Sequence, residues 1–128
     1  MKVAVIIARI LLGFVFTAAG LFNLLRLGKM SGMPVDATTF MSLMVAHHYP
    51  PFIGLIMLGG GVLLLVGRFV PIGLVLLGPI LINILLFHFM FHVPGAVTGL
   101  VCTVLEIFLI WAYRSTFHGL FVATPDIG

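Results

Sequence analysis

The chain has 128 residues, of which 62% are hydrophobic and 7% are charged, with a mean hydropathy of +1.36. Soluble domains carry about 25% charged residues, so this composition predicts an integral membrane protein. Six basic against three acidic residues give a net charge of +3. The basic residues are spread along the chain and form no patch that could neutralise phosphates, which excludes nucleic-acid binding. The single cysteine, Cys102, excludes a disulfide or thiolate cluster within one chain and is expected to be a buried, inert thiol.

The first apolar segment extends from about Val3 to Leu25, long enough for the roughly 20 residues that a membrane-spanning helix needs. With Lys2 before it and small residues near Ala18 and Ala19, it imitates a signal peptide. The apolar run continues past these small residues and further spans follow. We therefore expect an uncleaved first transmembrane helix.

The long connection, residues 26–50, is expected to be a loop followed by a short amphipathic helix over about 37–48. Asp36 is a plausible N-cap for this helix. One face would hold Phe40, Leu43, Met44 and His47. The helix would lie on the membrane surface or plug the mouth of the bundle, and an irregular loop is the alternative.

Three more spans are predicted at about 51–67, which is the shortest, 70–92 and 95–113. Prolines stand near their starts, and Pro79, inside the third span, should kink it. The short links force neighbouring spans to run antiparallel. The expected fold is thus all-α, a single-domain transmembrane four-helix up-down bundle with the amphipathic helix in its first loop.

Arg9 and Glu106 are the ionisable residues deepest in the apolar spans, each roughly 10 Å from the same membrane side at 1.5 Å per residue. Each of them belongs to a stripe that contains small residues. The first contains Arg9, Gly13, Phe16, Gly20 and Asn23, and the second contains Gly95, Gly99, Cys102, Thr103 and Glu106. These stripes predict that the first span packs on the fourth, with a buried ion pair. The pair would fix helix register, or form a proton or anion site, or anchor a ligand headgroup.

Asn83, His88 and His92 lie in the apolar stretch PILINILLFHFMFHVPG. Asn83 is expected to make hydrogen bonds inside the protein, between helices or to a carbonyl freed by Pro79. His88 and His92 are four residues apart and would share a helix face, on the membrane side that also holds His47. Interfacial hydrogen bonding, a metal, haem, or a quinone whose carbonyl accepts from a histidine are the open alternatives. His88, His92, Asn83 and His47 are the candidate ligand-binding residues, and no metal or catalytic residue is assigned.

The distribution of basic residues favours both termini in the cytoplasm. Lys2, Arg68 and Arg114 fall on the side of the N-terminus, against Arg26 and Lys29 on the other side.

The stretches ARILLGFVFTAAGLFNL, GRFVP and PILINILLFH make nearly the whole chain resemble the DoxX-like family of bacterial four-helix membrane proteins. The resemblance implies a compact bundle in the bacterial inner membrane. It also implies a link to quinone and thiol redox chemistry, with soluble enzymes as partners. Many members carry an acidic residue early in the second span, but residues 50–61 contain none, so that role cannot be carried over. The lone cysteine likewise excludes the dithiol chemistry of disulfide-forming relatives.

Three functions therefore compete. The first is a redox-associated component that binds a quinone or similar amphipathic ligand between its helices. The second is a module that binds or transports a small molecule held by Arg9 and Glu106. The third is a structural or assembly protein without a ligand. Membrane lipid, a soluble redox enzyme and a second copy of the chain are the expected partners.

Overall fold

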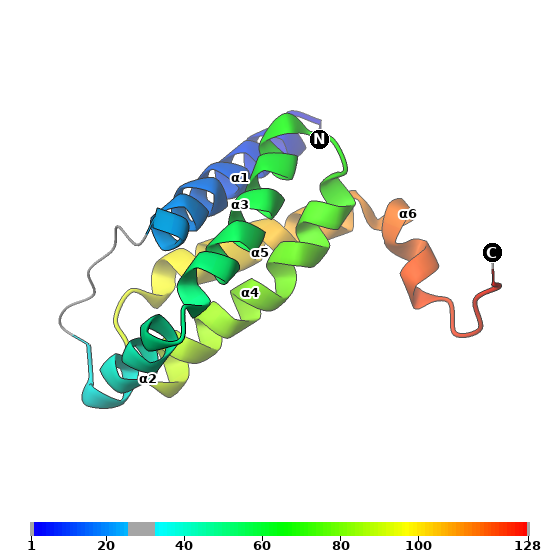
Figure 1. Cartoon of the computed structure of the whole chain (residues 1–128). Helices are drawn as coiled ribbons and strands as arrows, with labels where there is room; N and C mark the ends of the chain where they lie inside the picture. Colours follow the sequence, from blue (N-terminus) through cyan, green and yellow to red (C-terminus); the bar gives the residue numbers. More distant parts are fainter. Residues whose placement is uncertain (1, 26–32, 128) are drawn as a thin grey trace.

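The computed structural model describes residues 2–25 and 33–127, and these residues form helices and no strand. The elements are α1 (Lys2–Leu25), α2 (Val35–Ala46), α3 (Tyr49–Val66), α4 (Val70–Met90), α5 (Ala96–Ala112), α6 (Arg114–Phe117) and the 3-10 helix η1 (His118–Phe121) (Figure 1). Helices α1, α3 and α4 are long and apolar enough to cross a membrane. A fourth span results if α5 is joined to the α6–η1 segment, which bends away from it by 76°. The expected all-α membrane protein is confirmed at this level.

The ends of the spans agree with the sequence-based bounds to within about two residues. Gly67 follows the last residue of α3 with a φ of +79°, and Gly95 precedes α5 with a φ of +97°. Glycine adopts this conformation without strain, so both residues permit short turns. Helix α4 continues through Pro79 without ending. One expectation is wrong, because α5 has 17 residues and α3 has 18, so the fourth helix is the shortest of these apolar helices.

Helix α1 packs most closely on α3, through glycines on both helices, and less extensively on α5, which was the predicted partner. A Cβ added at Gly20 would lie 2.7 Å from the carbonyl oxygen of Gly54, and one at Gly13 would lie 2.9 Å from that of Gly61. Gly13 and Gly20 are seven residues apart on α1, and Gly54 and Gly61 are seven residues apart on α3. The two antiparallel backbones therefore come into contact at two levels. The predicted small-residue stripe on the first span is therefore buried as expected, but its partner is the second span. Glycines allow this approach because they carry no side chain.

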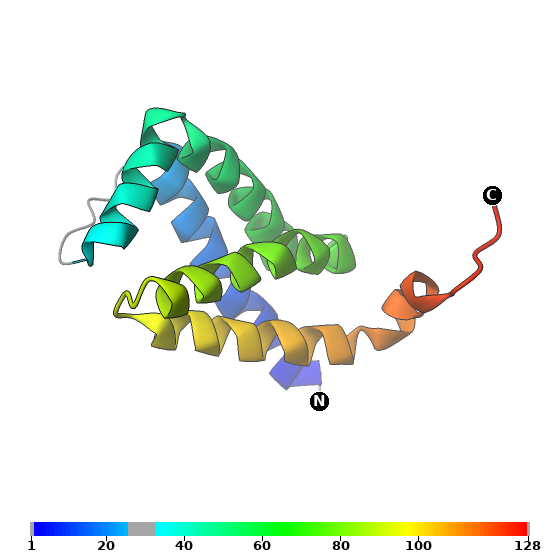
Figure 2. The same ribbon diagram turned by 90° about the horizontal axis from the view of Figure 1, so that it is seen from below.

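Helix α4 packs on α3 and helix α5 packs on α4. The turned view shows α4 and α5 beside the α1–α3 pair (Figure 2). Gly60 on α3 lies against Leu77 on α4, and Gly99 on α5 lies against Ile84 on α4. Leucines supply much of the interior packing. The largest fully buried side chains are Leu12, Phe16, Leu64, Leu74, Leu77 and Leu109.

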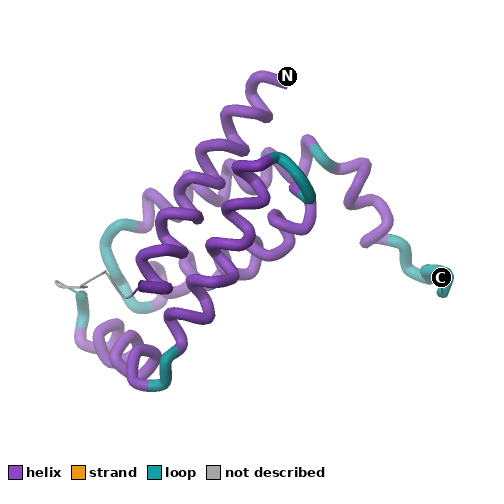
Figure 3. The backbone as a smooth tube through the Cα atoms, turned by 45° about the horizontal axis from the view of Figure 1, so that its top comes forward, coloured by secondary structure: helices purple, strands orange, loops and turns teal. Residues whose placement is uncertain are grey.

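Helix α2 lies at one end of the molecule (Figure 3). The centroid of its Phe40 ring lies 5.7 Å from that of Phe87 and 5.3 Å from that of Phe91, at the end of α4. The structure confirms a helix here in place of the alternative irregular loop, and the helix packs against the end of α4. Pro34, not Asp36, precedes the first helical residue, so the predicted cap is wrong and Asp36 lies within the first turn. The proline fixes an extended backbone there, with φ of −56° and ψ of 157°, and so sets the start of the helix.

The helix is also less amphipathic than predicted. Exposed apolar side chains surround much of it, namely Val35, Phe40, Leu43 and Val45. Only Ala37 among its residues is fully buried. Arg26 and Lys29, which entered the orientation argument, lie outside the described residues.

Candidate functional site

Glu106 is a buried acidic residue in the middle of α5 with no hydrogen-bond partner. Its side chain is 4% exposed, and neither carboxyl oxygen accepts a hydrogen bond from any described residue. The carboxyl group lies near α4 at Gly78, where an added Cβ would be 3.8 Å from Oε1 and would meet no other atom across the interface within 4 Å. An unsatisfied polar group in a protein interior costs about 1–3 kcal/mol, and more when charged, so this position demands an explanation.

Arg9 does not form the predicted ion pair with Glu106. Its guanidinium lies beside the turn between α3 and α4, where a Cβ at Gly67 would be 2.6 Å from Nη1, and its buried Nε has no hydrogen-bond partner. The predicted ion pair is wrong because the helices pack in a different order from the one predicted. Because α1 packs on α3, the side chain of Arg9 meets the end of α3 instead of α5. Arg9 on α1 therefore meets the turn after α3, whereas Glu106 on α5 lies near Gly78 of α4.

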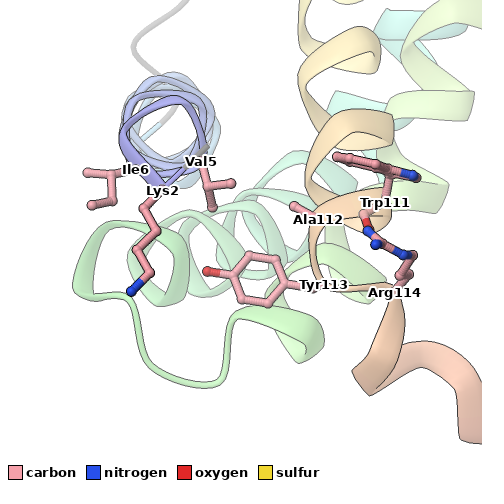
Figure 4. Close-up of a pocket in the computed structure, with 7 residues that line it drawn as sticks. All are labelled: Lys2, Val5, Ile6, Trp111, Ala112, Tyr113 and Arg114. Atoms are coloured by element: carbon pink, nitrogen blue, oxygen red, sulfur yellow. The ribbon is translucent and has the colours of Figure 1, made fainter.

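The seam between α1 and α5 opens at one end of the molecule into a cavity of about 420 Å³. Its lining residues are Lys2, Val5 and Ile6 from α1, and Trp111, Ala112, Tyr113 and Arg114 from the end of α5 and the start of α6. Figure 4 shows the side chain of Tyr113 projecting toward α1, with Trp111 and Arg114 beside one another. The Arg114 guanidinium carbon lies 4.6 Å from the Trp111 ring centroid, and its Nη1 donates to the Trp111 carbonyl at 2.9 Å.

This cavity is the feature that sequence reasoning missed. It combines two cations with two aromatic side chains and contains no acidic residue. Such a set suits the headgroup region of a membrane, where aromatic rings and basic side chains gather and basic pockets between spans bind anionic headgroups. The signal was present in the stretch WAYR, residues 111–114, but only the fold shows that Lys2 joins it.

His88 and His92 do not share a helix face, contrary to the prediction. Helix α4 ends at Met90, and His92 lies in the following turn with a left-handed φ of +55°, so the two rings do not share one helix face. His88 Nδ1 lies 2.8 Å from the Ile84 carbonyl oxygen and donates to it, which leaves Nε2 beside Gly95. His47 is exposed at the end of α2. Over residues 2–25 and 33–127, no three His, Cys, Asp or Glu side chains are grouped closely enough to hold a metal ion.

Asn83 faces outward, contrary to the prediction of a hydrogen bond inside the protein between helices. Its Nδ2 donates to the Pro79 carbonyl of its own helix at 3.1 Å. The buried face of α4 contains Leu77 and Leu81, and a residue two positions after Leu81 is turned by about 200° at 100° per residue. Asn83 and His88 therefore do not line a common interior site.

These observations define an all-helical integral membrane protein with an unpartnered acid in its interior and a basic, aromatic cavity at one end. Comparison with known proteins gives one relative, the uncharacterized protein YwoB of Bacillus subtilis (strain 168). The chain is 32% identical to it over 80 residues, which is 62% of this chain. The chain spans about half the length of that relative, 52%. No family model matches the chain, and no solved structure matches it.

Proposed function

We propose that the chain is a DoxX-like protein of the bacterial inner membrane that binds a small amphipathic molecule beside α5, at Glu106, where α5 meets its neighbours α1 and α4. In this proposal its four spans form an up-down bundle with both termini in the cytoplasm, and Glu106 holds the polar end of the ligand. The proposal rests on one observation above all: both carboxyl oxygens of Glu106 are buried without a partner. A ligand with hydrogen-bond donors would satisfy them.

The cavity at the end of the seam supports the same location. Glu106 and Tyr113 are seven residues apart on α5, which places them on nearly the same helix face and about 10 Å apart along the axis. A molecule that entered beside Tyr113 would therefore need to reach about two helical turns to meet the carboxyl group. Leu109, fully buried between them, would have to move aside.

A quinone in its reduced form is the ligand class we favour. Its hydroxyl groups can donate to the Glu106 carboxyl oxygens, and its apolar tail suits a site between membrane helices. The predicted contacts with His88 and Asn83 are replaced in this proposal, because those side chains bond to their own helix. A redox role with a soluble enzyme partner follows from the DoxX-like resemblance alone.

The test compares the small molecules that copurify with the native protein and with Glu106→Leu. We expect the native chain to carry a stoichiometric amphipathic molecule, identified by mass spectrometry of an organic extract, and Glu106→Leu to lose it. Asp36→Asn is the matched control, since it removes a carboxylate from an exposed residue outside the spans, and it should retain the molecule.

The same variant separates ligand loss from unfolding. Replacing an unpartnered buried acid by leucine should leave the thermal stability in detergent unchanged or higher. A stable Glu106→Leu protein that still carries the native amount of ligand would refute the proposed site. Absence of any bound molecule from the native protein would favour a structural or assembly role.

A further inference from the structure

The outward face of α4 carries polar groups at a depth where lipid offers them no partner. Val75, Ile82 and Leu86 are 52%, 61% and 46% exposed, and Pro79 and Asn83 are exposed beside them. These side chains lie at helical spacing and form one stripe, which we call the α4 outer face. None of them is charged.

Two polar groups interrupt this apolar stripe, the backbone carbonyl of Val75 and the side-chain amide of Asn83. Pro79 has no N–H, so the regular helical hydrogen bond to the Val75 carbonyl cannot form. Asn83 uses one amide N–H to reach the Pro79 carbonyl, while its second N–H and its Oδ1 have no partner among the described residues. The α4 outer face therefore offers both a donor and acceptors.

Their depth decides what can satisfy them. Helix α4 has 21 residues, and Asn83 lies seven residues before its end at Met90, or about 10 Å along the axis at 1.5 Å per residue. The hydrocarbon core is about 30 Å thick, so Asn83 lies well inside it, where neither water nor lipid tails can bond the amide. Asparagine side chains in membranes find their partners on neighbouring helices.

We propose that two copies of the chain associate through the α4 outer face, with their Asn83 side chains hydrogen-bonded to each other. A two-fold axis along the membrane normal brings each residue of this face to the same depth as its own copy. An amide is both donor and acceptor, so two Asn83 side chains related by that axis satisfy each other reciprocally. The absence of charge from the face leaves no repulsion between the copies.

A second copy is favoured over a different membrane protein for this geometric reason. Another partner would need its own polar group at the depth of Asn83, whereas a second copy supplies it by symmetry. The proposal does not depend on ligand binding at Glu106, which lies buried on α5.

The test measures dimerisation of the full chain in lipid nanodiscs or bicelles of neutral lipid, by single-molecule photobleaching of a labelled protein. The native chain should form dimers, and Asn83→Leu, which keeps the branching at Cγ but removes the amide, should weaken association by about tenfold. Val104→Leu is the matched control on the exposed face of α5 and should dimerise as the native chain does.

Cysteine cross-linking gives a second readout that does not depend on how Asn83→Leu folds. Ile82→Cys, on the α4 outer face, should form a disulfide between copies, whereas Val104→Cys should not, and Cys102 is buried. A native chain that remains monomeric, or an Asn83→Leu protein that dimerises like the native chain, overturns the proposal. The proposal is also overturned if Val104→Cys cross-links and Ile82→Cys does not. A native chain that is monomeric but binds another protein through the α4 outer face overturns it as well.

Discussion

Replacing Gly20 by alanine should force α1 away from α3 and destabilise the protein. The added Cβ would lie 2.5 Å from the Leu58 backbone nitrogen and 2.7 Å from the Gly54 carbonyl oxygen, whereas ordinary van der Waals contact begins at 3.4 Å. Both of these neighbours are backbone atoms, so no side chain can rotate to make room. The two helices must separate by about 1 Å, a gap that forfeits about a quarter to a half of each van der Waals contact along the seam.

The cost follows from the same geometry. Adding a methyl group to a well-packed interior typically costs about 1–3 kcal/mol, and we expect the upper end of this range because the whole seam must open. About 3 kcal/mol corresponds to a roughly hundredfold change in the unfolding equilibrium. Unfolding by SDS in mixed micelles, followed by helical circular dichroism and by the fluorescence of the single tryptophan, Trp111, would measure it.

Gly59→Ala provides a matched control on α3. A Cβ at Gly59 meets nothing within 4 Å, so this substitution makes the same change of residue type within a helix without a clash. It should unfold at the native SDS concentration or above it, since alanine favours a helix by about 1 kcal/mol relative to glycine. Equal stability of Gly20→Ala and Gly59→Ala would refute the account of the seam.

Two further predictions concern the ends of the molecule. Phe40→Ala should release α2 from α4, because it removes two aromatic pairs worth about 0.5–1.5 kcal/mol each, and limited proteolysis should then cut near α2 faster than in the native chain. If the cleavage rate does not change, α2 is held by other contacts. The double variant Lys2→Ala with Arg114→Ala should reduce copurifying anionic lipid several-fold, as measured by native mass spectrometry, because both cations line the cavity. Arg68→Ala removes an exposed cation that is not in this cavity and should retain the lipid; equal loss in both proteins would argue for nonspecific charge attraction.

The positions of the spans were readable from the sequence because long apolar runs and glycine or proline boundaries are local properties. The predicted first span, residues 3–25, differs from α1 by one residue, and the third, 70–92, differs from α4 by two. The turns at Gly67 and Gly95 were marked in the same way. Helix length and end are set by nearby residues, so they need no knowledge of the fold.

The pairing of helices was not readable from one stripe at a time. Gly13 and Gly20 were correctly assigned to an interior face, but the matching pair with the same spacing, Gly54 and Gly61, was overlooked in favour of the stripe near Glu106. Equal depth of two charges then suggested an ion pair that the packing does not form. Depth is one coordinate, and contact also requires that two helices be neighbours and face each other.

The orientation of Asn83 was hidden for a related reason. Apolar residues surround α4 on all sides, so its periodicity does not distinguish a buried face from one that lipid would cover. Inside a membrane, outward residues are as apolar as inward ones, and the usual contrast between core and surface is lost. Only the contacts of Leu77 and Leu81 with the interior show that Asn83 points away.

The bend after α5 affects the membrane around the protein. Helix α1, with 24 residues, is about 36 Å long, but α5, with 17, measures only about 25 Å and is shorter than a hydrocarbon core of about 30 Å. The two helices thus present different hydrophobic lengths to the lipid, a mismatch that tilting of α1 and thinning of the bilayer beside α5 would relieve. The chain then turns by 76° into a segment whose Leu120 and Phe121 are exposed, and with α5 upright this segment lies close to the membrane plane. We expect this segment to extend α5 into the membrane interface, and the protein to concentrate in thinner membranes.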